Sequence, residues 1–286
     1  MKINSIAALC CIGLLAGEFV SCGGHSDKSQ ESVDIKSFAY NQVLKSASRN
    51  YLLVIDGQPH YLNIGAVIEW PEKIGHHDIS QLQDSLASYT FGDSIYSTPD
   101  DAIRNFIDGV KDLKDYFGEI DEISVVDSIP SDEPAFILKT EASMVDISRD
   151  YVTYKVSNSQ YLGGAHGEVA SLPFTFDLVN GKVMTPDSYF VEGDSVKSAV
   201  IDIVKESLAY QYGYTPQQLQ KAGIFQYDNA GIGYPYIKDG ILYIHYNPYD
   251  IAPYSAGSFD IPVNSVMISS YLTPEVKELI GYDYDY

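Results

Sequence analysis

The chain has 286 residues, in which 39 aspartates and glutamates outnumber 18 lysines and arginines and give a net charge of −21. Such a charge repels the phosphates of nucleic acids, so we exclude a nucleic-acid-binding function and expect cationic partners to be attracted. All three cysteines lie within the first 22 residues, which leaves none in residues 23–286 for a disulfide, a thiolate nucleophile or a cysteine-ligated zinc.

The chain begins with the pattern of a bacterial lipoprotein signal. A short positive start precedes an apolar run over residues 3–16, and Cys22 stands where such a signal is cut and acylated. An apolar run of about 14 residues is about 21 Å long as a helix, too short for a hydrocarbon core of about 30 Å. We therefore predict a signal peptide over residues 1–21 and a lipid on Cys22. The alternative is an ordinary secretory peptide cleaved near Ser21, because Phe19 replaces the leucine usual at that position.

A flexible tether is predicted next, over residues 22–34, because this segment is rich in glycine, serine and charge and has no apolar periodicity. Two folded domains are predicted to follow, over residues 35–148 and 149–286. The lipid would attach both to a membrane of the bacterial envelope, with the outer membrane favoured and the periplasmic or surface side left open.

The first half carries both strand and helix signals. Strand-like runs cover residues 36–46, 51–55, 60–70, 123–126 and 135–148, and a further run at 151–157 follows the predicted boundary. Asp56-Gly57 predicts a hairpin turn, and Pro59 is expected to disturb its register. A short helix is predicted for residues 79–86. The strongest helix begins at Thr98-Pro99, where an N-cap precedes proline, and its apolar stripe continues to Phe117.

The second half repeats a strand–helix–strand order. Strands are predicted for residues 169–178, 234–238 and 241–246, with turn signals at Asn180-Gly181 and Asp239-Gly240. Helices are predicted from a cap at Asp194 to near Gly213, from Thr215-Pro216 to Gly223, and from Thr273-Pro274 through Ile280. Mixed strands, hairpin turns and few crossover helices predict an α+β fold, with mainly antiparallel sheets packed by one or more helices in each domain.

Two motifs in the second half go beyond generic patterns. One is Tyr-Leu-Gly-Gly-Ala-His-Gly at residues 161–167, followed by residues 174–178 and Gly181-Lys182, and the other spans residues 246–257. In this order and separation they resemble the extracellular domain of the RsiV-type anti-sigma factors, which also accompanies the PdaC-type peptidoglycan deacetylases. A less distinctive domain of unknown function precedes it in that family, and residues 35–148 resemble that domain.

The resemblance implies an envelope domain that contacts peptidoglycan or lysozyme. RsiV-type proteins bind lysozyme and carry a sigma-binding segment and a membrane span ahead of this domain, whereas this chain has a lipoprotein signal there. PdaC-type proteins carry a separate metal-dependent catalytic domain, whose His-x-x-x-His ligand spacing this sequence lacks. Neither transmembrane signalling by that route nor deacetylation is therefore implied.

The candidate ligand-binding residues come from these two motifs. They are Tyr161, Gly163, Gly164, His166, Tyr249 and Tyr254. For His166 we favour a structural role, hydrogen-bonded across a glycine turn, because the sequence has no G-x-S-x-G nucleophile elbow. Tyr249 and Tyr254 lie in a proline-rich connection and either pack beneath it or face outward as recognition groups; packing is narrowly favoured.

Two other groups of polar residues have the composition of a metal site or a glycosidase site. His76-His77-Asp78 offers three metal ligands, but adjacent side chains point different ways, so a loop leading into a helix cap is favoured. Glu69 and Glu72 beside the only tryptophan do not establish the carboxylate separation that glycosidases need. We predict no catalytic residue, metal or cofactor.

The leading functional hypothesis is a non-enzymatic, lipid-anchored envelope protein that binds cell-wall glycan or a cationic protein such as lysozyme. A second hypothesis is a hydrolase of wall polymers, motivated by His166 with Glu168 and Asp177 nearby in the sequence. A third is a structural subunit of an envelope complex.

Overall fold

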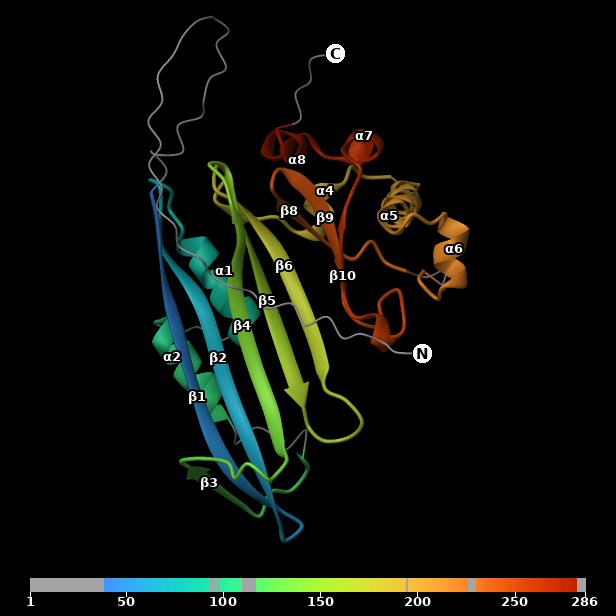
Figure 1. Ribbon diagram of the computed structural model, residues 1–286. Coiled ribbons are helices and arrows are strands. Elements are labelled where there is room, and N and C mark those ends of the chain that lie inside the picture. The colour runs from blue at the N-terminus through green and yellow to red at the C-terminus, as the bar shows by residue number, and fades with distance from the viewer. Residues whose placement is uncertain are drawn as a thin grey trace, which may run out of the picture. The chain divides into compact units, whose positions relative to one another are not determined.

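The computed structural model describes residues 39–92, 96, 98–109, 117–193, 195–225 and 230–281 (Figure 1). The predicted signal peptide, the predicted lipid attachment at Cys22 and the predicted tether lie outside this range, as does Asp194. Within it, no helix is both long and apolar enough to cross a bilayer.

The described chain starts with a long hairpin. Strand β1 (Tyr40–Ile55) pairs with β2 (Gln58–Ile74), so the predicted strands at 36–46 and 51–55 are one continuous strand. The turn at Asp56-Gly57 is confirmed, and both residues have the positive φ that a two-residue hairpin turn requires. The expected disturbance at Pro59 is wrong. Pro59 lies opposite Val54 in the second pair from the turn, where the missing N–H would point away from β1.

This hairpin belongs to a seven-stranded sheet in the order β3-β1-β2-β4-β5-β6-β7. The other strands are β3 (Glu122–Val126), β4 (Ala135–Ile147), β5 (Tyr151–Tyr161), β6 (Glu168–Asp177) and β7 (Lys182–Val183). Only the β2–β4 pairing is parallel among the described strands, which confirms the prediction of mainly antiparallel sheet. The predicted boundary near Ser148 falls in the turn between β4 and β5, and residues 38–286 form one compact unit.

Helices α1 (Ser80–Phe91) and α2 (Pro99–Asp108) cover one face of this sheet, behind β1, β2 and β4 in Figure 1. Thr98 caps α2 as predicted, because its hydroxyl accepts a hydrogen bond from the N–H of Asp101 at 3.1 Å. Ile103 and Ile107 of the predicted stripe are buried, and residues 110–116 lie outside the described range. The helices and the sheet share one apolar core.

A second core surrounds a three-stranded sheet in the order β10-β9-β8. Its strands are β8 (Tyr234–Lys238), β9 (Ile241–Tyr246) and β10 (Phe259–Pro262). The helices around it are α4 (Pro186–Tyr189), α5 (Val196–Tyr212), α6 (Pro216–Lys221), α7 (Ser265–Ile268) and α8 (Pro274–Leu279), with short 3-10 helices at Tyr254–Ala256 and Ser269–Tyr271. The predicted hairpin at Asp239-Gly240 and the predicted starts of α6 and α8 are confirmed.

Two buried threonines of the large sheet hold Ile237 of β8. The hydroxyl of Thr153 on β5 donates to the carbonyl of Ile237 at 2.6 Å, and the N–H of Ile237 donates to Thr175 on β6 at 2.9 Å. The two hydroxyls lie 2.9 Å apart. A closed set of hydrogen bonds therefore joins the two sheets at a position that water does not reach.

Candidate functional site

The two sequence motifs lie against each other in the fold. Residues 161–167 form the turn between β5 and β6, and residues 247–257 connect β9 to β10. The ring of His166 stacks on the ring of Tyr254, with centroids 4.1 Å apart and an angle of 18° between planes. The hydroxyl of Tyr254 donates to the carbonyl of Gly167 at 2.5 Å. Segments separated by about eighty residues are thus joined through the candidate residues.

The glycines of the first motif form a tight corner. Gly163 and Gly164 both have positive φ, 93° and 96°, which side chains with a Cβ disfavour. The hydroxyl of Tyr161 donates to the carbonyl of Gly164 at 3.3 Å, and Nδ1 of His166 lies 2.9 Å from the carbonyl oxygen of Gly167. These contacts are local to the turn and are those of a structural corner.

The two candidate tyrosines of the second motif, Tyr249 and Tyr254, differ in whether they pack beneath the connection or face outward. Tyr254 is partly buried and packs on His166, whereas Tyr249 is 61% exposed. Tyr249 also has a φ of 74°, which is uncommon for a residue with a side chain. Its ring centroid lies 5.5 Å from that of Tyr254. One tyrosine therefore packs and the other faces outward.

A buried polar cluster supports the second motif from below. His245 on β9 is 1% exposed; its Nδ1 lies 2.8 Å from a carboxylate oxygen of Asp260, and its Nε2 lies 3.2 Å from Oδ1 of Asn247. The Asn247 amide pairs with the backbone of Ser171 on β6, accepting from its N–H at 2.6 Å and donating to its carbonyl at 3.0 Å. Both ring nitrogens of His245 therefore face side-chain oxygens that can accept a hydrogen bond.

The carboxylate of Asp260 is the charged centre of this cluster. Burial by itself would raise the pKa of Asp260, but the hydrogen bond and charge of His245 outweigh it. The charge of Lys155 and the hydroxyl of Tyr236 act in the same direction, and together they hold the pKa of Asp260 at about 2. Burial, followed by this neighbouring carboxylate, raises the pKa of Tyr236. The cluster thus favours a charged Asp260 and a neutral Tyr236.

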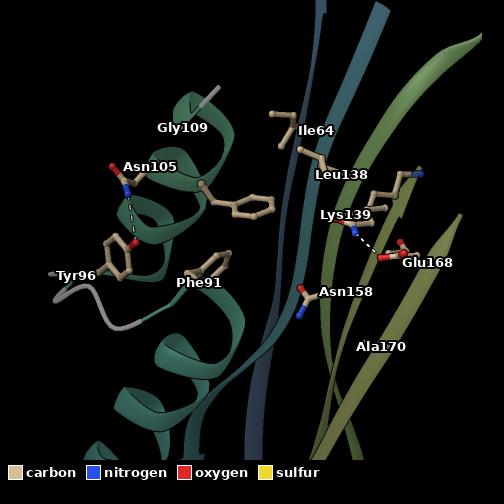
Figure 2. A pocket seen from close by; sticks show the side chains of 13 residues that line it. Ile64, Phe91, Tyr96, Asn105, Gly109, Leu138, Lys139, Asn158, Glu168 and Ala170 are labelled. Atoms are coloured by element: carbon tan, nitrogen blue, oxygen red, sulfur yellow. Dashed lines mark hydrogen bonds between the residues drawn. The ribbon is translucent and has the colours of Figure 1, made fainter. Parts of the chain in front are cut away.

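A separate cleft of about 460 Å³ lies between helices α1 and α2 and the large sheet (Figure 2). Aromatic and aliphatic side chains line one part of it, and amides, a carboxylate and Lys139 line the other. The lining includes the side chains of Phe91, Tyr96, Asn105, Phe106, Asn158, Gln160 and Glu168. The ends of β5 and β6 that carry Gln160 and Glu168 flank the glycine corner at residues 161–167, so the cleft begins next to the first motif.

Some of the polar side chains around the cleft are hydrogen-bonded to one another. The amide of Asn105 donates to the hydroxyl of Tyr96 at 3.2 Å, and the amide of Gln160 donates to Glu168 at 2.7 Å. Figure 2 shows Asn158 between these two pairs. The side chain of Asn158 has no hydrogen-bond partner within the described part of the chain. The cleft therefore offers a free amide beside aromatic faces, a combination that suits a neutral ligand with hydroxyl and amide groups.

None of the six candidate ligand-binding residues lines this cleft. Its residues come from α1, α2, the segment between them and strands β2, β4, β5 and β6, and they share no motif, so no local pattern indicates them. His245 and Asp260 were also missed, although His245 immediately precedes the second motif.

Carboxylates of the other candidate sites, Asp78 and Glu69, accept hydrogen bonds from the backbone. Asp78 accepts a hydrogen bond from the N–H of Ser80 at the start of α1, as a helix-cap loop requires. Glu69 accepts from the N–H of Met144 at a register shift in β4. Among the described residues, no group of three or more His, Cys, Asp or Glu side chains is arranged to hold a metal ion. Asp177 accepts from two backbone N–H groups of the following turn, at the opposite end of β6 from Glu168.

Comparison with known proteins identifies related folds. Residues 189–264 match the family model described as a protein of unknown function, DUF3298. No curated protein matches the chain significantly. A DUF3298 family member from Bacteroides fragilis superposes with a TM-score of 0.66 at 21% identity, covering 85% of this chain and 98% of that chain. A DUF3298 family protein from Pseudomonas aeruginosa superposes with a TM-score of 0.54 at 15% identity, covering 84% and 96%. The likeness to these two structures shows a shared fold.

Proposed function

We propose that this chain is a lipid-anchored protein of the bacterial cell envelope that binds cell-wall glycan in the cleft beneath α1 and α2. The observation that carries the proposal is the cleft itself, because its volume of about 460 Å³ lies in the range typical of small-ligand sites. The lipid anchor is supported by the pattern around Cys22 in the sequence.

The chemistry of the cleft suits an N-acetylated sugar. Phe91 and Phe106, with ring centroids 5.9 Å apart, offer apolar faces to the C–H face of a sugar ring and to an acetamide methyl group. Asn158 offers an amide that donates to and accepts from hydroxyl and acetamide groups. Wall polysaccharide built from N-acetylated hexosamines presents all of these groups, and the resemblance to peptidoglycan-associated domains is consistent with it.

A second candidate function, capture of a cationic protein such as lysozyme, is favoured by the net charge of −21. Opposite charge accelerates association and makes binding sensitive to salt. Calorimetric titration with lysozyme at low and at physiological salt tests this candidate. Heat of binding that falls steeply with salt supports it, and no binding at low salt rejects it.

The glycan proposal is tested by titrating the protein with muramidase-released peptidoglycan disaccharide in a calorimeter. We expect the wild type to bind and the Asn158→Ala variant to bind at least tenfold more weakly. Asn41→Ala is the matched control, because Asn41 is an exposed asparagine of the same sheet that pairs with Glu72 outside the cleft. Failure of the wild type to bind the disaccharide at millimolar concentration, or equal weakening in both variants, would reject the glycan function.

A further inference from the structure

The seven-stranded sheet ends on one side at β3, whose outer edge is open. β3 pairs with β1 from Glu122 opposite Val54 to Val126 opposite Asn50. It is the last strand in the sheet order, and no strand of the described residues pairs with its other side. An open strand edge presents unpaired N–H and C=O groups in the spacing that another extended chain can match.

The direction of the backbone identifies which amides face this edge. The N–H of Asp121, just before β3, donates to the carbonyl of Val54 at 2.8 Å and so points toward β1. The carbonyl of Val54 therefore points toward β3, as the hairpin requires. Ile55 and Gln58 flank the two-residue turn as a hydrogen-bonded pair, so Val54, Leu52 and Asn50 turn their N–H and C=O groups away from β2. Their partners Glu122, Ser124 and Val126 are thus bonded to β1, and the N–H groups of Ile123 and Val125 point to the open edge.

The side chains of β3 do not protect the edge. Natural proteins commonly guard an exposed edge with lysine, proline or a bulge, and β3 has none of these. Ile123 is 37% exposed and Val125 is 61% exposed, and their alternation places both on one face of the strand. An added strand could cover this apolar pair while it completes the backbone hydrogen bonds.

Charge indicates the kind of chain that fits. Residues 115–138 contain no lysine or arginine. The carboxylates near β3 in the sequence are Glu119, Asp121, Glu122, Asp127, Asp132 and Glu133. This field repels a second copy of the chain, which carries the same charges, and attracts a basic segment. Lysine or arginine residues alternating with apolar residues would meet the carboxylates while covering Ile123 and Val125.

We propose that the open edge of β3 binds an extended basic peptide segment, with alternating basic and apolar residues, as an additional strand. The proposal is independent of the glycan function, because no residue of β3 lines the cleft. Its partner is a polypeptide whose recognition depends on backbone pairing, so two variants of one β3 residue can separate pairing from simple charge attraction.

The probe is a synthetic nine-residue peptide of alternating lysine and valine, capped at both ends, and its binding is measured by fluorescence anisotropy. Val125→Pro removes an outward N–H and leaves the bonds to β1 in place, whereas Val125→Thr keeps the N–H and nearly the same side-chain shape. We expect the wild type and Val125→Thr to bind within threefold of each other and Val125→Pro at least tenfold more weakly. Thermal unfolding of each variant confirms that the fold is retained.

Amide hydrogen exchange on the wild type gives a second readout that does not depend on the proline variant. Peptide binding should slow exchange at Ile123 and Val125. Equal affinity of Val125→Pro and Val125→Thr would overturn the proposal, because charge alone would then explain binding. So would unchanged exchange in the complex, equal binding of a glutamate–valine peptide, or a dimer of the protein that Val125→Pro abolishes.

Discussion

The two faces of the seven-stranded sheet are held to the rest of the protein by different chemistry. Toward α1 and α2 the core of the contact is apolar, with buried side chains such as Leu82 and Leu86 meeting the strands, and ion pairs such as Lys45–Asp100 lie at its exposed margin. Toward β8 the contact at β5 and β6 is made by the hydroxyls of Thr153 and Thr175. Apolar packing is non-directional and leaves room for a cleft at its margin, whereas paired hydrogen bonds fix one register between two sheets.

The apolar face should show the larger loss when a single side chain is truncated. Leu86 is fully buried in α1, so Leu86→Ala removes transfer free energy and leaves a cavity, at a cost of about 2–5 kcal/mol. The control is Leu44→Ala, since Leu44 is exposed and surface changes stay within about 0.5 kcal/mol. Urea unfolding measures both. A loss below about 1 kcal/mol for Leu86→Ala would mean that α1 is not packed as described.

On the polar face, Thr175→Val preserves side-chain volume but leaves the buried N–H of Ile237 without its acceptor. We expect a loss of about 1–3 kcal/mol in the free energy of unfolding. Ser157→Ala is the comparison, because it breaks the partly buried Ser157–Ser171 hydroxyl pair without orphaning a backbone group. If Thr175→Val and Ser157→Ala cost the same, the threonines do not hold β8.

On the polar side, the free energy of unfolding should also depend on pH, through the carboxylate of Asp260. The folded-state pKa of Asp260, about 2, lies below its ordinary value of 3.8, so its ionised form stabilises the fold above about pH 4. That contribution is lost as the pH falls from about 4 through about 2. The stability difference between the wild type and Asp260→Asn should therefore shrink between pH 5 and pH 2 in urea unfolding. A difference that stays constant over this range would contradict the charged cluster.

Local signals in the sequence predict the elements well. The turn at Asp239-Gly240 and the Thr-Pro helix starts are confirmed because they depend on neighbouring residues alone. The continuity of β1 was missed because polar residues interrupt its apolar pattern. One of these, Arg49, pairs with Asp108 of α2, a partner that the local pattern cannot supply.

In the candidate site, too, residues within a local motif were predicted and residues that come together from separate elements were not. The motifs at 161–167 and 246–257 were recognised, and the fold brings His166 and Tyr254 together. The cleft was missed because Phe106 and Asn158 belong to different elements and neither lies in a motif. His245 was missed because its charged partner Asp260 lies on β10 and comes beside it only when β10 pairs with β9. The predicted lipid on Cys22 stays a prediction.

The most direct test of glycan binding is a crystal structure of the protein with peptidoglycan disaccharide. The sugar should lie in the cleft, with a ring against Phe91 or Phe106 and its acetamide or hydroxyl groups hydrogen-bonded to Asn158. A disaccharide bound elsewhere, for example on the exposed ring of Tyr249, with the cleft left empty, would contradict the assignment of this cleft as the binding site.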